Sequence, residues 1–215
     1  TLDRFIRFLG AAYGIAPPSH LLRVHLTTGT WEVRRRAEEL HGLDVSPATV
    51  GYAFVDDASV VAFVQGTAVG TALHEIFHLL VRESFGDVPQ WLDEGMASLY
   101  EVAGREGDVY FGLDNWRGDV LRDLWEMRPS AEELVRTEWF LFDDPDQVEA
   151  VEETAAHPER FFMAESGARQ AAVMAMARYF VLYLERRGRL APVFAAIRDR
   201  GFAELDGDAR DHAVA

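Results

Sequence analysis

Residues His74–Glu101 read HEIFHLLVRESFGDVPQWLDEGMASLYE and predict two consecutive helices. The break between them is the turn-forming run GDVP at positions 86–89, and helical spacing of apolar residues lies on both sides. His74 and His78 are four positions apart, so both imidazoles lie on one face of the first helix. Glu94 follows His78 by sixteen residues, and it joins them if the second helix returns antiparallel beside the first.

This set of side chains suits a catalytic zinc site. Such a site has three protein ligands and one open position, and two histidines with one glutamate is a recurring combination. We therefore expect one Zn²⁺ bound by His74, His78 and Glu94. Glu75 lies beside His74 but off the ligand face, where it would act as general base on the water that zinc activates. The alternative is a helix that carries two incidental histidines of the seven in the chain.

The second helix extends the pattern, because its start reads Trp-Leu-Asp-Glu-Gly-Met-Ala over residues 91–97. In these two segments the chain resembles the gluzincin group of zinc metallopeptidases, in which His-Glu-x-x-His is followed by Trp-Leu-x-Glu-Gly-x-Ala. The resemblance implies that His74, His78 and Glu94 bind zinc and that Glu75 is the catalytic base. It also makes Glu101, seven residues beyond Glu94, a candidate acceptor for the free N–H of a ligand histidine. A surface glutamate is the alternative for that position.

A short β-branched run precedes the first helix and predicts a strand. In gluzincins a strand at this place forms an exposed edge beside the cleft, where an extended peptide adds through backbone hydrogen bonds. The resemblance thus implies a substrate edge formed by Val60, Val61, Ala62, Phe63 and Val64. An interior strand is the simpler alternative.

Downstream, residues 171–188 predict a helix similar to the C-terminal helix of these peptidases. Many relatives place a tyrosine there that donates a hydrogen bond to the oxyanion, and the corresponding residue in this chain is Met174. Loss of an oxyanion donor typically costs about two to three orders of magnitude in rate. The sequence offers other donors but assigns the role to none of them: Tyr110, His157, Arg169 and Tyr179.

We expect an α+β, zincin-like fold in a single domain spanning residues 1–215. Residues 1–66 predict a helix and a small, mostly antiparallel sheet, with strands at 22–28 and 48–55 and a helix at 30–41 ending near Gly42. The zinc helix would lie beneath this sheet, within residues 67–103, and residues 104–215 are mainly helical. In the first strand His25 alternates with the apolar residues, which indicates a surface imidazole. Residues 104–118 predict a loop that could wall the cleft.

Composition excludes several classes of function. A net charge of −15 argues against nucleic-acid binding, and Arg34-Arg35-Arg36, the one basic run, is interleaved with glutamates as on a solvated helix face. The chain has no cysteine, hence no thiolate nucleophile, and no apolar run reaches the length of a membrane span. All 21 basic residues are arginine, a bias that suggests a GC-rich bacterial source. Compartment, whether cytoplasmic or exported, and oligomeric state stay open.

The predicted function is zinc-dependent hydrolysis of a peptide bond in a peptide or protein substrate. In the group that the chain resembles, aminopeptidases typically carry a Gly-x-Met-Glu-Asn element before the zinc helix. No such element occurs in this sequence, so the resemblance slightly favours an endopeptidase over an aminopeptidase. The alternative is a weak or inactive peptidase-like zinc protein that serves as a binding or scaffold module, as Met174 would suggest. A structural zinc site is disfavoured because such sites use four protein ligands, although His157 could be a fourth.

Overall fold

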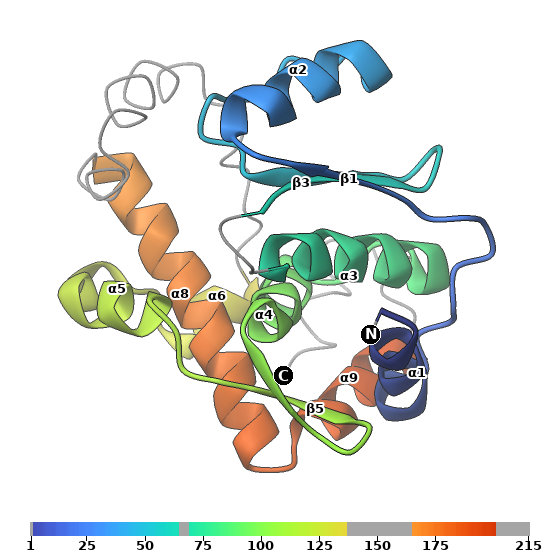
Figure 1. Cartoon of the computed structure of the whole chain (residues 1–215). Helices are drawn as coiled ribbons and strands as arrows, with labels where there is room; N and C mark the ends of the chain where they lie inside the picture. Colours follow the sequence, from blue (N-terminus) through green and yellow to red (C-terminus); the bar gives the residue numbers. More distant parts are fainter. Residues whose placement is uncertain (1, 65–68, 137–164, 201–215) are drawn as a thin grey trace.

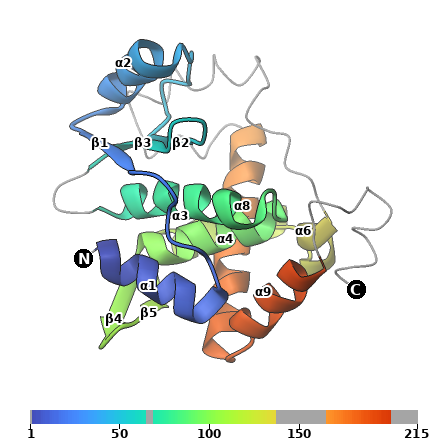
Figure 2. The same cartoon turned by 90° about the vertical axis from the view of Figure 1, so that its right-hand side faces the viewer.

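The computed structural model describes residues 2–64, 69–136 and 165–200. A three-stranded sheet of β1 (Arg23–Thr27), β2 (Gly51–Phe54) and β3 (Ser59–Phe63) lies between two helices. Helix α2 (Thr30–His41) covers one face of this sheet, and α3 (Gly70–Phe85) lies under the other (Figures 1 and 2). Helices dominate the C-terminal half, so the α+β class is confirmed, and the predicted zinc helix lies beneath the sheet.

Strand β3 is the centre of the sheet, which has the order β1-β3-β2. It pairs in parallel with β1 after the crossover through α2, and antiparallel with β2 through a short hairpin. The sheet is therefore mixed, and the expectation of a mostly antiparallel sheet is wrong, because the connection through α2 brings β1 and β3 together in the same direction. The expected substrate edge at residues 60–64 is therefore wrong. Both sides of β3 are hydrogen-bonded to neighbours, and Val60, Val61 and Ala62 are fully buried. The interior strand, the simpler alternative, is what the structure shows, and β2 forms the edge of the sheet on that side.

The burial of β1 is the reverse of its expected alternation. Val24 and Leu26 are 37% and 55% exposed, whereas Thr27 is buried and His25 is half-buried. The expected surface position of His25 is thus wrong. The cause is nonlocal: α3 packs against β2 and β3 on the lower face of the sheet, while α2 packs over β1 on the face that His25 shares.

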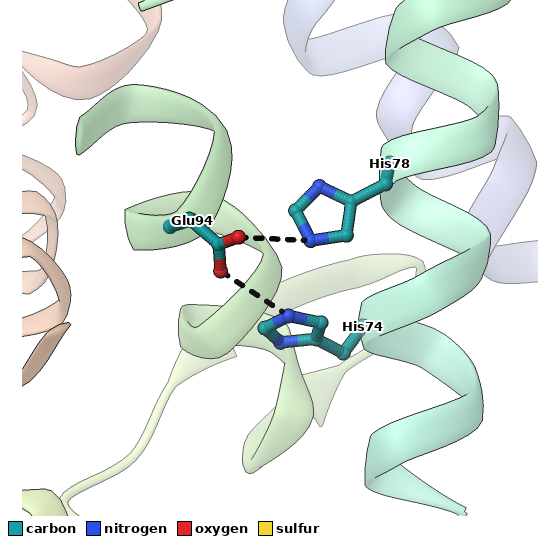
Figure 3. Close-up of side chains that lie close together, drawn as sticks. All are labelled: His74, His78 and Glu94. Carbon is teal, nitrogen blue, oxygen red and sulfur yellow. Dashed lines mark ion pairs between the residues drawn. The ribbon is translucent and has the colours of Figure 1, made fainter. Parts of the chain in front are cut away.

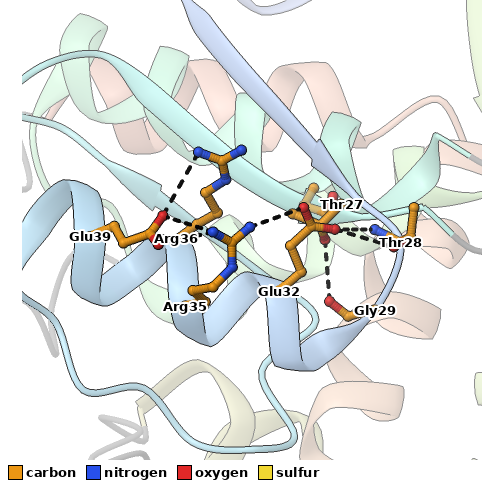
Figure 4. A network of polar contacts seen from close by, with 8 residues as sticks. Thr27, Thr28, Gly29, Glu32, Arg35, Arg36 and Glu39 are labelled. Atoms are coloured by element: carbon orange, nitrogen blue, oxygen red, sulfur yellow. Dashed lines mark hydrogen bonds and ion pairs between the residues drawn. The ribbon is translucent and has the colours of Figure 1, made fainter.

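The basic run on α2 forms a solvated helix face, as predicted (Figure 4). Arg35 lies 3.5 Å from Glu32 and 2.9 Å from Glu39, and Arg36 lies 3.9 Å from Glu39. Such exposed pairs, one helical turn apart, contribute little to stability because water and salt screen them. The helix ends at Gly42, whose left-handed backbone returns N–H bonds to the last turn, as the sequence predicts.

The other elements surround α3. Helix α1 (Leu2–Tyr13) precedes the sheet, and after α4 (Gln90–Glu101) come β4 (Ala103–Glu106), β5 (Val109–Gly112), α5 (Arg117–Asp123), the 3-10 turn η1 (Trp125–Met127), α6 (Ala131–Arg136), α8 (Glu165–Arg186) and α9 (Leu190–Asp199). The expected loop at 104–118 therefore includes an antiparallel hairpin, β4–β5. One buried apolar cluster joins residues from α1, β3, α3, α4, α8 and α9.

Candidate metal centre

Two packed helices build the candidate site. Helix α3 ends at Phe85, Gly86 takes a positive φ of 70°, and Pro89 precedes the first turn of α4, so the chain reverses within a few residues. Both helices bury most of their apolar residues, which fixes the pair against each other. On its other side α4 packs closely on α8, where a Cβ built at Gly95 would lie 2.5 Å from Val181 Cγ2. The residue before Gly95 is the predicted ligand Glu94.

The three predicted ligands converge between α3 and α4 (Figure 3). His74 Nε2 lies 3.4 Å from Glu94 Oε2, and His78 Nε2 lies 3.7 Å from Glu94 Oε1. Zinc bonds of about 2.0–2.2 Å in a tetrahedron imply about 3.3–3.6 Å between ligand atoms. The observed separations are close to that spacing, and one ligand atom from each residue lies within 4.8 Å of the others.

The surroundings of these atoms also fit a cation. Glu94 Oε2 is buried and has no hydrogen-bond partner among the residues that the structure describes. A buried carboxylate oxygen without a partner is costly, and a dication would satisfy it. Two imidazoles and one carboxylate form a donor set that zinc accepts, so the group could hold a metal ion.

Asp93 completes this arrangement, and the sequence reasoning missed it. Its Oδ1 lies 2.9 Å from His78 Nδ1, the imidazole nitrogen that faces away from Glu94. Metal-binding histidines usually direct their second nitrogen at a carboxylate or carbonyl, which fixes the ring and increases its basicity. The available signal was an acidic residue directly before the ligand glutamate.

The electrostatics of the group are dominated by burial and by opposite charges at short range. Burial alone would raise the pKa of Glu94, but the charge of His78, the close approach and charge of His74, whose Nε2 lies 3.4 Å away, and the charge of Arg117 lower it to about 2. Burial would lower the pKa of His78, and the charges of Asp93 and Glu94 outweigh it and raise that pKa to about 10. Without a metal, the site thus holds a proton on His78 beside the ionised carboxylate of Glu94.

Glu75 lies next to the ligand group, on the side of the sheet edge. A Cβ built at Gly51 would lie 3.2 Å from Glu75 Cγ and 2.9 Å from Thr71 Cγ2, so the absence of a side chain at Gly51 lets β2 approach α3 closely. Burial raises the pKa of Glu75, and the charges of His74 and His78 partly oppose that rise. A bound dication would add a further attraction for the ionised carboxylate.

Glu101 does not serve a ligand histidine, contrary to the expectation. Its Oε2 accepts a hydrogen bond of 3.0 Å from Arg117 Nη2, and both side chains are largely buried. The backbone explains this placement: Glu101 ends α4 opposite Gly70, at the first residue of α3, which is one helical turn before His74. Glu101 is therefore beyond the histidines, and Asp93 is the carboxylate that contacts one of them.

Within the part of the chain that the structure describes, none of the candidate oxyanion donors is seen to contact the ligand group. Met174 packs half-buried against the core, and Tyr110 packs in an aromatic cluster with Phe5. Tyr179 donates a hydrogen bond of 3.2 Å to the Asn115 carbonyl. Arg169 is exposed, and His157 lies outside the described residues.

Comparison of the chain with protein-family models, with curated proteins and with solved structures finds no match. Within the described ranges, no helix combines the length and apolar character that crossing a membrane requires. The case for a function consequently rests on the geometry of the site.

Proposed function

We propose that this protein is a zinc-dependent peptide hydrolase in which His74, His78 and Glu94 bind the metal and Glu75 is the general base. The observation that carries the proposal is the convergence of the three ligand atoms from α3 and α4, with the carboxylate of Glu75 close enough for the charges of both histidines to act on its pKa. A site that only held zinc would have no use for Glu75. Among the described residues no fourth ligand joins the group, which fits a catalytic site with an open position.

When bound, zinc acidifies a water molecule and polarises a carbonyl group. The other steps belong to side chains of the chain. Glu75 accepts a proton from the attacking water and delivers it to the leaving amine. Asp93 holds the His78 ring in place through Nδ1, so that Nε2 faces the metal position.

The substrate is best placed along β2. This strand is an edge of the sheet, and its Gly51 faces Glu75 on the side of α3. An extended peptide that pairs with β2 would be held by backbone hydrogen bonds, with little dependence on its side chains. We therefore propose β2 as the substrate-binding edge, in place of β3, for which the sequence had predicted this role.

The decisive experiment compares Glu75→Gln with the parent protein. The parent, loaded with one equivalent of zinc, should cleave members of a mixed peptide library. Glu75→Gln should bind zinc with the same stoichiometry and lose turnover by about two orders of magnitude or more, as expected for a general base. Glu83→Gln, on the same helix but paired with Ser19, is the matched control and should keep the parent rate.

A scaffold function is the second candidate, and the specific observation in its favour is Met174 at the position where related enzymes carry tyrosine. Zinc binding without turnover in the parent, or equal rates in the parent and Glu75→Gln, would establish that alternative. A failure to bind zinc at all would contradict both candidates.

A further inference from the structure

A second polar group lies beside the metal centre and has no role in the proposed chemistry. We call Asn115, Arg117 and Arg178 the donor cluster. Four of its nitrogen atoms are buried without a hydrogen-bond partner among the described residues: Asn115 Nδ2, Arg117 Nε, and Arg178 Nε and Nη1. All four are N–H donors, and Arg178 is fully buried. Unpaired buried donors of this kind are costly, at about 1–3 kcal/mol each and more for charged groups.

The hydrogen bonds of the two arginines involve only one terminal nitrogen of each guanidinium group, Nη2. Arg117 Nη2 binds Glu101 at 3.0 Å, and its guanidinium lies 4.4 Å from the centre of the Trp116 ring. Arg178 Nη2 donates to the carbonyl groups of Val102 and Leu113. These contacts fix the orientation of both guanidinium groups and leave Arg117 Nε and Arg178 Nε and Nη1 buried without a hydrogen-bond partner among the described residues.

Asn115 is held in the same way. Its Oδ1 accepts the backbone N–H of Arg117 at 3.0 Å, which directs the amide nitrogen away from that contact. Its backbone N–H and carbonyl both meet the Tyr179 hydroxyl, at 3.4 Å and 3.2 Å. The segment that begins α5 is thus fastened to α8 at the donor cluster.

The two guanidinium groups of the cluster have different acidic neighbours. Arg117 Nη2 pairs with Glu101 Oε2 at 3.0 Å. Burial, followed by the charge of Arg117, lowers the pKa of Arg178 to about 10, and the charges of Glu101 and Asp114 oppose that fall. The Arg178 guanidinium therefore remains cationic at neutral pH, and its Nε and Nη1 have no hydrogen-bond partner among the described residues.

The donor cluster is adjacent to the ligand group. Glu101, which Arg117 binds, packs against the first residue of α3, one turn before His74. The charge of Arg117 also contributes to lowering the pKa of Glu94, so the guanidinium is within effective electrostatic range of the metal ligand. Arg178 follows Ala177, the residue of α8 that contacts Gly95, next to Glu94.

We propose that the donor cluster is a substrate-binding subsite that accepts a carboxylate group of the peptide. This proposal rests on the proposed function and specifies its substrate class. Guanidinium donors suit a carboxylate because the two planar groups can form paired, charge-assisted hydrogen bonds, and the Asn115 amide adds a third donor. The carboxylate is either the free C-terminus of the peptide or the side chain of an aspartate or glutamate.

A binding experiment tests the subsite without requiring turnover. The full chain carrying Glu75→Gln, loaded with zinc, is equilibrated with a library of N-acetylated peptides of mixed sequence, and bound peptides are measured by mass spectrometry. The library has three arms: a free C-terminus without acidic residues, an amidated C-terminus without acidic residues, and an amidated C-terminus with one aspartate or glutamate. One or both carboxylate arms should bind about 10- to 100-fold more tightly than the amidated arm that lacks a carboxylate.

Substitution of Arg117 locates the effect. Arg117→Gln should remove that preference while affinity for the uncharged arm stays within a factor of two. Arg122→Gln is the matched control, because Arg122 lies on the same helix, has the same charge and is 71% exposed. It should keep the preference.

Each result has a defined meaning. Preference for the free C-terminus alone identifies the chain end as the ligand, and preference for acidic residues alone identifies a side chain. Equal binding of all three arms, no measurable binding, or a preference that survives Arg117→Gln would overturn the subsite, and the first two need no substitution within the donor cluster. A clear preference in a protein whose parent form cleaves nothing would reject hydrolysis and keep the subsite.

Discussion

Asp93→Asn is the sharpest test of how the metal centre is supported. The substitution keeps the size of the side chain and removes the charge that lies 2.9 Å from His78 Nδ1. The pKa of His78 rises from 6.5 to about 10, and after burial, which acts in the opposite direction, Asp93 is the largest contributor. A rise of that size corresponds to about 5 kcal/mol of preference for the charged ring, shared among the neighbouring carboxylates.

Loss of this carboxylate should weaken zinc binding because the ring becomes less basic and less fixed. Removal of such a partner costs about 10- to 100-fold in metal affinity, or about 1.4–2.7 kcal/mol. Competition with a chromophoric chelator at pH 7.5 measures the change. Asp87→Asn is the control, since Asp87 lies exposed in the turn before α4. Equal affinities for the two variants would refute the orienting role of Asp93.

Proton release gives a second readout of the same substitution. Because the pKa of His78 is about 10 without metal, zinc binding at pH 7.5 must displace its proton. Calorimetric titration in two buffers of different ionisation enthalpy should show about one proton released by the parent and clearly fewer by Asp93→Asn. The same number in both proteins would mean that Asp93 does not control the basicity of His78.

Two further outcomes follow from the structure. Gly51→Ala should reduce kcat by about tenfold or more without changing zinc affinity, because the new Cβ would lie 3.2 Å from Glu75 Cγ and displace the base. A parallel loss of zinc binding would contradict this. In chelator-treated protein, the raised pKa of His78 stabilises the fold fully below pH 6.5, and that stabilisation disappears as pH rises through about 10. The lowered pKa of Glu94 stabilises the fold fully above pH 4.5, and that stabilisation is lost as pH falls through about 2. The melting temperature should therefore fall between pH 7 and pH 10, and fall less in His78→Gln; equal slopes would count against the ion pair.

The sequence predicted correctly the helix ends and turns that depend on residues close together in the chain. Helix α2 has the predicted bounds because Gly42 supplies its left-handed end, and the chain reverses between α3 and α4 because Gly86 and Pro89 stop one helix and begin the next. The convergence of His74, His78 and Glu94 needed one additional assumption, an antiparallel return of the second helix, and the structure satisfies it.

Features that depend on which helices and strands pack together could not be predicted from the sequence of a single segment. The alternation in β1 shows two faces but not which face is covered, and α3 leaves Val24 and Leu26 exposed because it lies under β2 and β3. The strand at residues 59–63 is rich in β-branched residues, as both edge and central strands can be. Only the parallel pairing with β1 made it central.

Asp93 shows why a ligand partner is harder to predict than a ligand. Successive residues on a helix point about 100° apart, so a metal bound by Glu94 would not place its neighbour in the same site. Both carboxylates nevertheless approach His78, one at each ring nitrogen, because the two nitrogens lie on different sides of the imidazole ring: Asp93 lies 2.9 Å from Nδ1 and Glu94 lies 3.7 Å from Nε2. The donor cluster was still harder to predict, because Arg117 on α5 and Arg178 on α8 are 61 positions apart in the sequence (178 − 117). Proximity of that sort follows from the packing of α8 against α4 and α5, and the sequence spacing that identified the metal ligands contains no information about it.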